Sequence, residues 1–234
     1  MPRALSRAFP YLLALAAMLP LGAACGGDDD VEIDPDGCDQ AALLPMSYRP
    51  VAMVSNGAVA TTADGDVTSA VIDATAGGIP GQADNPYTYV DLAAGEKVSI
   101  DDVDALSSDE WDLAFKRSSV RSNGGDSGPG DVAVAVVDGS IDDAIDAPAD
   151  SQFTTDDWTA DGCELSSLPF GEPTTAFGEW YDYDVDTHLL TPKPEVHVVR
   201  SASGDLFKLS IETYYGDDAD PTRGAVYRVS WAPL

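Results

Sequence analysis

The C-terminal third of the chain carries the pattern that most limits its fold, a strict alternation of apolar and polar side chains. In Leu206–Glu212 (LFKLSIE), Phe207, Leu209 and Ile211 fall on one face and polar residues fill most of the other. Successive side chains of a β-strand point to opposite faces, so this period of two indicates a strand with one buried face. Another apolar run, Glu195–Ser201 (EVHVVRS), precedes it, and the intervening ASGD has the composition of a tight turn. The two runs predict an antiparallel hairpin.

Further short segments have the composition of strands. Each is rich in β-branched or aromatic residues and bounded by Gly, Pro, Asn or Asp. These segments are Asp66–Ala74, Tyr87–Leu92, Trp111–Phe115, Val132–Val137 and Val226–Trp231. Few stretches favour a long helix. We therefore predict a mostly β fold, with antiparallel sheets joined by hairpins and meanders and only a few short helices.

The N-terminus has the features of an export signal. Arg3 and Arg7 precede the apolar run 8–24, which two prolines interrupt and which is too short for a comfortable transmembrane helix. The run ends in LGAAC, and the small residues before Cys25 resemble a bacterial lipobox, where cleavage leaves the cysteine as a lipid-bearing N-terminus. Gly22 stands where that motif has leucine, so ordinary secretion with cleavage after a small residue stays open. Both alternatives predict export.

The predicted organisation has three parts. Residues 1–24 are expected to be a signal peptide, residues 25–37 a lipidated Cys25 with a flexible tether, and residues 38–234 a single β domain. The tether GGDDDVEIDPDG has six acidic residues and few apolar ones, which is typical of a solvated linker. If Cys25 carries lipid, Cys38 and Cys163 remain in an oxidising compartment, and we expect them to form a disulfide.

Charge and motifs restrict the function. The chain has 41 acidic and 12 basic residues, a formal net charge of -29, which argues against nucleic acid or anionic lipid as partners of the bulk surface. Membrane contact is expected through the lipid anchor only. The sequence lacks the nucleophile-elbow, zinc-protease and phosphate-loop motifs, so we assign no catalytic residue and do not expect an enzyme. Asp182, Asp184 and Asp186 begin like a calcium loop, but the required glycine and final glutamate are absent.

The chain has two histidines. His197 lies inside a strand pattern, VHVVR, where a lone histidine is expected to be structural. His188 lies in the loop-like segment YDYDVDTHLL, which makes it the better ligand candidate, although a structural role stays open there too.

The stretch EWDLAFKRSSVRSNGG concentrates three of the few basic residues, Lys116, Arg117 and Arg121. Alternation assigns Trp111, Leu113 and Phe115 to one buried strand face and directs Asp112 the other way. The favoured interpretation of the basic residues is exposed pairing with surrounding carboxylates, which contributes on the order of 0–1 kcal/mol a pair. The other is neutralisation of an anionic ligand group.

The same stretch, in the motif WDLAFKR…RSNGG, resembles the HmuY-like family of bacterial lipoproteins. Supporting segments follow in the same order over roughly Tyr87 to Trp231, among them WYDYDVDTH (180–188) and FKLSIETYY (207–215). The resemblance implies a mostly β, non-enzymatic domain held by lipid at the bacterial envelope, at the outer membrane or cell surface. The best-known members take haem from host carriers and pass it to an outer-membrane receptor.

In those members two side chains, typically histidines, hold the haem iron. By resemblance His188 is the candidate axial ligand, and Lys116, Arg117 and Arg121 are candidate contacts for the propionates; no other metal is expected. A second ligand is not evident, because residues 123–181 contain no His or Met. Haem or a related tetrapyrrole is therefore the first ligand to test, with a haem carrier or receptor as partner. The alternative is an acidic surface domain with a structural, adhesive or partner-binding role.

Overall fold

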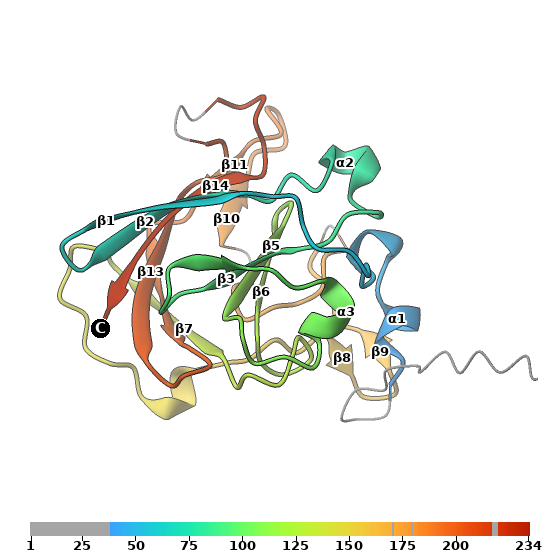
Figure 1. Ribbon diagram of the computed structural model, residues 1–234, viewed down its shortest axis with the longest axis horizontal. Coiled ribbons are helices and arrows are strands. Elements are labelled where there is room, and N and C mark those ends of the chain that lie inside the picture. The colour runs from blue at the N-terminus through green and yellow to red at the C-terminus, as the bar shows by residue number, and fades with distance from the viewer. Residues whose placement is uncertain (1–37, 170, 179, 217–219) are drawn as a thin grey trace, which may run out of the picture. The chain divides into compact units, whose positions relative to one another are not determined.

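The computed structural model describes residues 38–169, 171–178, 180–216 and 220–234 (Figure 1). The expected signal peptide, Cys25 and the acidic tether lie outside these residues. Within them, no helix has the length and apolar character needed to cross a membrane.

The larger sheet has six antiparallel strands in the order β1-β2-β14-β13-β12-β7. Their bounds are β1 (Val59–Asp64), β2 (Val67–Asp73), β7 (Ala133–Asp138), β12 (Glu195–Arg200), β13 (Leu206–Thr213) and β14 (Val226–Pro233). The last three are consecutive neighbours and form the predicted meander. The backbone N–H of Ser201 donates to the carbonyl of Asp205 at 2.9 Å and closes the predicted turn. Phe207, Leu209 and Ile211 are buried on one face, which confirms the alternation.

The smaller sheet has four antiparallel strands in the order β4-β3-β5-β6. They are β3 (Thr88–Asp91), β4 (Glu96–Val98), β5 (Leu113–Lys116) and β6 (Ser119–Ser122). Two further hairpins belong to neither sheet. One pairs β8 (Thr159–Ala160) with β9 (Glu164–Leu165), and the other pairs β10 (Tyr181–Tyr183) with β11 (Leu190–Pro192). The helices are single turns: α1 (Gln40–Leu43), η1 (Met46–Tyr48), α2 (Gly78–Gly81), α3 (Asp102–Ala105) and η2 (Asp150–Gln152). The predicted fold class is confirmed.

Hydrophobic clusters cover both faces of the smaller sheet. One cluster joins the two sheets, and its contacts include the edge-on pair Phe115–Tyr227 with ring centroids 5.1 Å apart. The other contains Tyr89 and Ala114 of the small sheet together with Trp158. Burying a large apolar side chain contributes about 1.5–3 kcal/mol, so these clusters are the main source of stability.

The two covered faces overturn one expectation from alternation. Leu113 and Phe115 lie in the cluster between the sheets, but Trp111 precedes β5 and packs in the other cluster, edge-on to Tyr89 with centroids 5.0 Å apart. Asp112 is also buried, and its carboxylate accepts hydrogen bonds from the backbone N–H groups of Leu92 and Ala202, both at 2.8 Å. Both faces of this strand pack against apolar residues, so neither face is exposed to solvent and the alternation of side chains does not identify a single buried face.

The expectation of exposed ion pairs is wrong for Lys116 and Arg121. Lys116 is 0% exposed and Arg121 is 3% exposed. The guanidinium of Arg121 lies between two aromatic rings, 5.0 Å from the centroid of Tyr87 and 4.6 Å from that of Trp158. The ammonium of Lys116 lies 5.3 Å from the Tyr87 ring, and burial lowers the pKa of this lysine to about 8. Cations over aromatic faces, away from water, replace the surface pairs.

Cys38 and Cys163 form the predicted disulfide, with Cα atoms 5.5 Å apart across a sequence separation of 125 residues. The bond ties the first described residue to the β8–β9 turn (Figure 1). A cross-link over so long a loop restricts the unfolded chain strongly.

Candidate functional site

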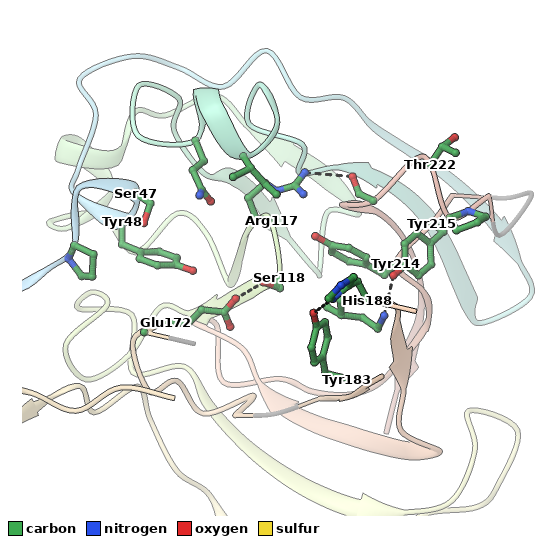
Figure 2. A pocket seen from close by; sticks show the side chains of 17 residues that line it. Ser47, Tyr48, Arg117, Ser118, Glu172, Tyr183, His188, Tyr214, Tyr215 and Thr222 are labelled. Atoms are coloured by element: carbon green, nitrogen blue, oxygen red, sulfur yellow. Dashed lines mark hydrogen bonds between the residues drawn. The ribbon is translucent and has the colours of Figure 1, made fainter. Parts of the chain in front are cut away.

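A cavity of about 790 Å³ opens between the β10–β11 hairpin, the β5–β6 turn and the connection from β13 to β14 (Figure 2). Its volume is within the range of about 300–1,000 Å³ that is usual for small-ligand pockets. The aromatic and apolar lining consists of Tyr48, Tyr183, Tyr214, Tyr215, Ile79, Leu190, Pro45 and Pro221. The polar lining includes Arg117, Ser118, Glu172, His188, Gln82, Ser47 and Thr222.

The β10–β11 turn presents His188 to this cavity. The N–H of His188 donates to the carbonyl of Asp184 at 2.8 Å, and the N–H of Asp184 donates to the carbonyl of Leu189 at 2.9 Å. The Asp184 side chain accepts from the next turn residues, Asp186 N–H and Thr187 N–H, and these bonds lower the pKa of its carboxyl group. His188 itself has φ +60°, a conformation that histidine adopts more readily than most residues. Backbone bonds therefore position this exposed histidine.

The imidazole of His188 has one partner from its own hairpin. Its Nδ1 lies 2.5 Å from the phenolic oxygen of Tyr183, and the two rings are tilted by 38° with centroids 6.0 Å apart (Figure 2). The opposite strand is attached to the domain, because the N–H of Leu190 donates to the phenolic oxygen of Tyr215 at 2.8 Å. Nε2 is the nitrogen left for a ligand.

Arg117 and Glu172 set the electrostatics of the cavity wall. Arg117 has φ +51° in the β5–β6 turn, and its guanidinium Nη1 lies 3.4 Å from the carbonyls of Thr75 and Gly224. Glu172 is 8% exposed and accepts a hydrogen bond from the hydroxyl of Ser118. Burial, and then the Glu172 carboxylate, raise the pKa of Tyr48 well above its ordinary value. An anionic group in this cavity would be attracted toward Arg117 and repelled from Glu172.

The sequence-predicted site residues separate in space. His188 and Arg117 line the same cavity, whereas Lys116 and Arg121 lie in the core beside Tyr87. His197 lies in β12, 1% exposed and stacked on Phe177 with centroids 4.6 Å apart. Of the three basic residues, Arg117 therefore remains the candidate contact for an anionic ligand group.

Sequence reasoning did not identify the tyrosines or Glu172 as site residues. The only signal for Tyr183, Tyr214 and Tyr215 was the density of aromatic and acidic residues in WYDYD and ETYY, and no local motif marked Tyr48 or Glu172. Among the described residues that line the cavity, His188 is the one histidine and there is no Met or Cys. The cavity thus offers one imidazole, one guanidinium and several phenol rings, a combination suited to a flat ligand with a metal and an anionic edge.

Comparison with known proteins gives one family. The family model described as HmuY protein matches residues 83–227. Similar solved structures include a candidate lipoprotein of Bacteroides fragilis, with 18% identity, 74% of this chain and 92% of that chain covered and a TM-score of 0.46. A candidate HmuY-like haem-binding protein of Bacteroides vulgatus has 16% identity, coverage of 75% and 96%, and a TM-score of 0.48. The apo HmuY analog of Tannerella forsythia has 14% identity, coverage of 77% and 99%, and a TM-score of 0.46. No curated protein matches significantly.

Proposed function

Because the chain belongs to the HmuY family, we propose that it is an exported, lipid-anchored envelope protein that binds haem or a related tetrapyrrole in the cavity beside His188. The observation that carries this proposal is the meeting of His188, Arg117 and a wall of tyrosines at one cavity. The role is binding and transfer rather than catalysis, and the partner would be a protein that delivers the ligand or receives it.

The lining residues fit such a ligand. Imidazole is a common axial ligand of haem iron, and His188 would hold the iron through Nε2. Arg117 would pair with a propionate, because a guanidinium binds a carboxylate through charge-assisted hydrogen bonds. The rings of Tyr214 and Tyr215 would pack on the macrocycle. When bound, haem would supply an iron centre whose coordination the protein tunes.

The test is a titration of the mature protein with haemin and, in parallel, with metal-free protoporphyrin. His188→Asn is the informative variant, because asparagine tolerates the positive φ at this position and lacks the imidazole. We expect it to weaken haemin binding at least about tenfold, which corresponds to 1.4 kcal/mol. Protoporphyrin binding should stay unchanged, since it does not depend on an axial ligand. Absorbance in the Soret region reports both ligands.

Val185→Ala is the matched control, because Val185 lies in the same turn, is 72% exposed and is not part of the lining. Equal haemin affinity in His188→Asn and the wild type would reject His188 as the ligand. If neither porphyrin binds in a saturable manner, the tetrapyrrole proposal fails and the acidic surface domain becomes the better interpretation.

The lipid anchor is a separate proposal that rests on the segment 22–25. Small residues precede Cys25 and resemble a lipoprotein-processing site, although Gly22 replaces the leucine of that motif, and we expect mature protein with an acylated Cys25 as its first residue. Mass spectrometry of the membrane fraction should find this modified N-terminus, and Cys25→Ser should move the protein to the soluble fraction. A free amino group on a residue after another small residue would show ordinary secretion instead.

A further inference from the structure

We propose that Tyr183 is a positioning residue for His188: its phenolic oxygen accepts a hydrogen bond from Nδ1–H and so keeps Nε2 unprotonated and directed to the ligand. The inference rests on the proposed function, in which iron binds Nε2. It starts from the 2.5 Å contact between the phenolic oxygen of Tyr183 and Nδ1 of His188, two side chains that line one cavity.

The direction of this hydrogen bond decides what the imidazole can bind. A neutral imidazole carries one proton, so Nδ1–H leaves a lone pair on Nε2. If the tyrosine hydroxyl donated to Nδ1 instead, Nε2 would carry the proton and could not coordinate a metal without losing it. Metal-binding histidines commonly donate their second N–H to an oxygen acceptor that fixes the tautomer and the ring orientation. In this protein the phenolic oxygen of Tyr183 lies where such an acceptor would be, next to Nδ1 of His188.

The β10–β11 hairpin places the side chains of Tyr183 and His188 next to each other. Tyr183 is the last residue of β10 and pairs with Leu190, the first residue of β11, so it marks the base of the turn that carries His188. Trp180, next to β10, is buried, and its indole N–H donates to the carbonyl of Ser118 at 2.9 Å. The Tyr183 ring is itself partly buried and packs against the hydrophobic cluster between the sheets, which restricts its position.

Within the described part of the chain, the contact of Nδ1 is with the Tyr183 phenol and not with a carboxylate. Asp184, one of three aspartates in this hairpin, follows Tyr183 directly, and its Oδ1 accepts from the backbone N–H groups of Thr187 and Asp186. It therefore serves the turn itself, while Nδ1 contacts the phenol. A tyrosine acceptor also adds no charge to the site, unlike a carboxylate.

The first arm of the test uses the ligand-free full-length protein. Nitrogen-15 NMR distinguishes protonated from unprotonated imidazole nitrogens, and the chain has only two histidines, so His188→Asn assigns the signals. At a pH where His188 is neutral, we expect Nδ1 of His188 protonated and Nε2 unprotonated. Tyr183→Phe should shift His188 away from this tautomer and leave the buried His197 unchanged. A wild-type His188 with the proton on Nε2 would overturn the proposal.

The second arm measures ligand binding. Loss of an outer partner of a metal-binding histidine typically costs about 10–100-fold in metal affinity, so Tyr183→Phe should weaken haemin by about tenfold or more and leave protoporphyrin unchanged. Unchanged haemin affinity would overturn the proposal. A phenolate-to-iron charge-transfer band that disappears in Tyr183→Phe would also overturn it, because Tyr183 would then be the ligand. If haemin does not bind the wild type at all, the proposed function fails, and the NMR arm still decides the hydrogen bond.

Discussion

Asp156→Ala is expected to lower the free energy of unfolding by about 3–5 kcal/mol, the largest effect of any single substitution that we predict. Asp156 is 1% exposed and lies between η2 and β8. Its Oδ2 accepts from Ser122 N–H at 3.0 Å and from the hydroxyl of Ser127, and its Oδ1 accepts from the Ser122 hydroxyl and from Ala176 N–H, both at 2.8 Å. One carboxylate thus connects three separate segments.

The magnitude follows from what the substitution leaves behind. Two backbone and two hydroxyl donors would lose their acceptor in the interior, and each unsatisfied buried group costs about 1–3 kcal/mol before relaxation. The buried Arg121 guanidinium, which donates from Nε to the Ser127 hydroxyl at 3.0 Å, would also lose a nearby negative charge. Removing one partner of a buried charge pair is strongly destabilising for this reason.

Chemical denaturation of the wild type and the variant at neutral pH measures this difference. Asp157→Ala is the matched control, because Asp157 has the same chemistry and is exposed. We expect the control to change stability by no more than about 0.5 kcal/mol. A loss below about 1 kcal/mol in Asp156→Ala would mean that water or relaxation satisfies the four donors.

The sequence predicts where most strands lie, including buried ones, but it predicts which side chains share a buried face only where the other face of the strand is exposed to solvent. The strand Leu206–Thr213 alternates between buried and more exposed residues over most of its length, and its turn with Glu195–Arg200 lies where the sequence places it. The strand after Trp111 was assigned one buried face, since nothing local signals that a second cluster covers the other side. The disulfide was predictable because only two cysteines remain once Cys25 is set aside as the expected site of lipidation.

The site residues also differ in how far the sequence predicts them. His188 and Arg117 were recognisable as scarce residue types, a loop histidine and a cation in an acidic chain. Lys116 and Arg121 share that scarcity, but Tyr87 and Trp158 cover them from distant parts of the chain, and no short-range pattern reports such contacts. The contact between Tyr183 and His188 depends on the hydrogen bonds of one turn, so it becomes visible only in three dimensions.

His197 is expected to make the domain acid-sensitive. Both of its ring nitrogens are buried and lack a hydrogen-bond partner within the described residues, and the nearest carboxylate oxygen, from Glu195, is 3.6 Å from Nε2. Burial lowers the pKa of His197 from 6.5 to about 4, with a smaller contribution from Lys193. An imidazole stacked on Phe177 in the sheet therefore stays neutral at pH values where the unfolded chain takes up a proton.

The sign of the pH effect follows from linkage. Between pH 6.5 and about 4 the unfolded state binds more protons at this histidine than the folded state, so stability falls as the pH falls through this window. Each unit of pKa difference corresponds to about 1.4 kcal/mol, which gives a loss of about 3 kcal/mol at pH 4 relative to pH 7.5. Below pH 4 both states are protonated and the loss from this group stops growing.

His197→Phe isolates this contribution, because phenylalanine keeps the stacked ring and removes the titration. Burial raises the pKa of Asp156 to about 6, so Asp156 titrates across the same range with the opposite sign. The quantity to measure is therefore the difference in unfolding free energy between variant and wild type at pH 7.5 and at pH 4. We expect that difference to shift by about 3 kcal/mol in favour of the variant at pH 4. Parallel profiles for His197→Phe and wild type would mean that His197 gains a proton acceptor or water contact in solution.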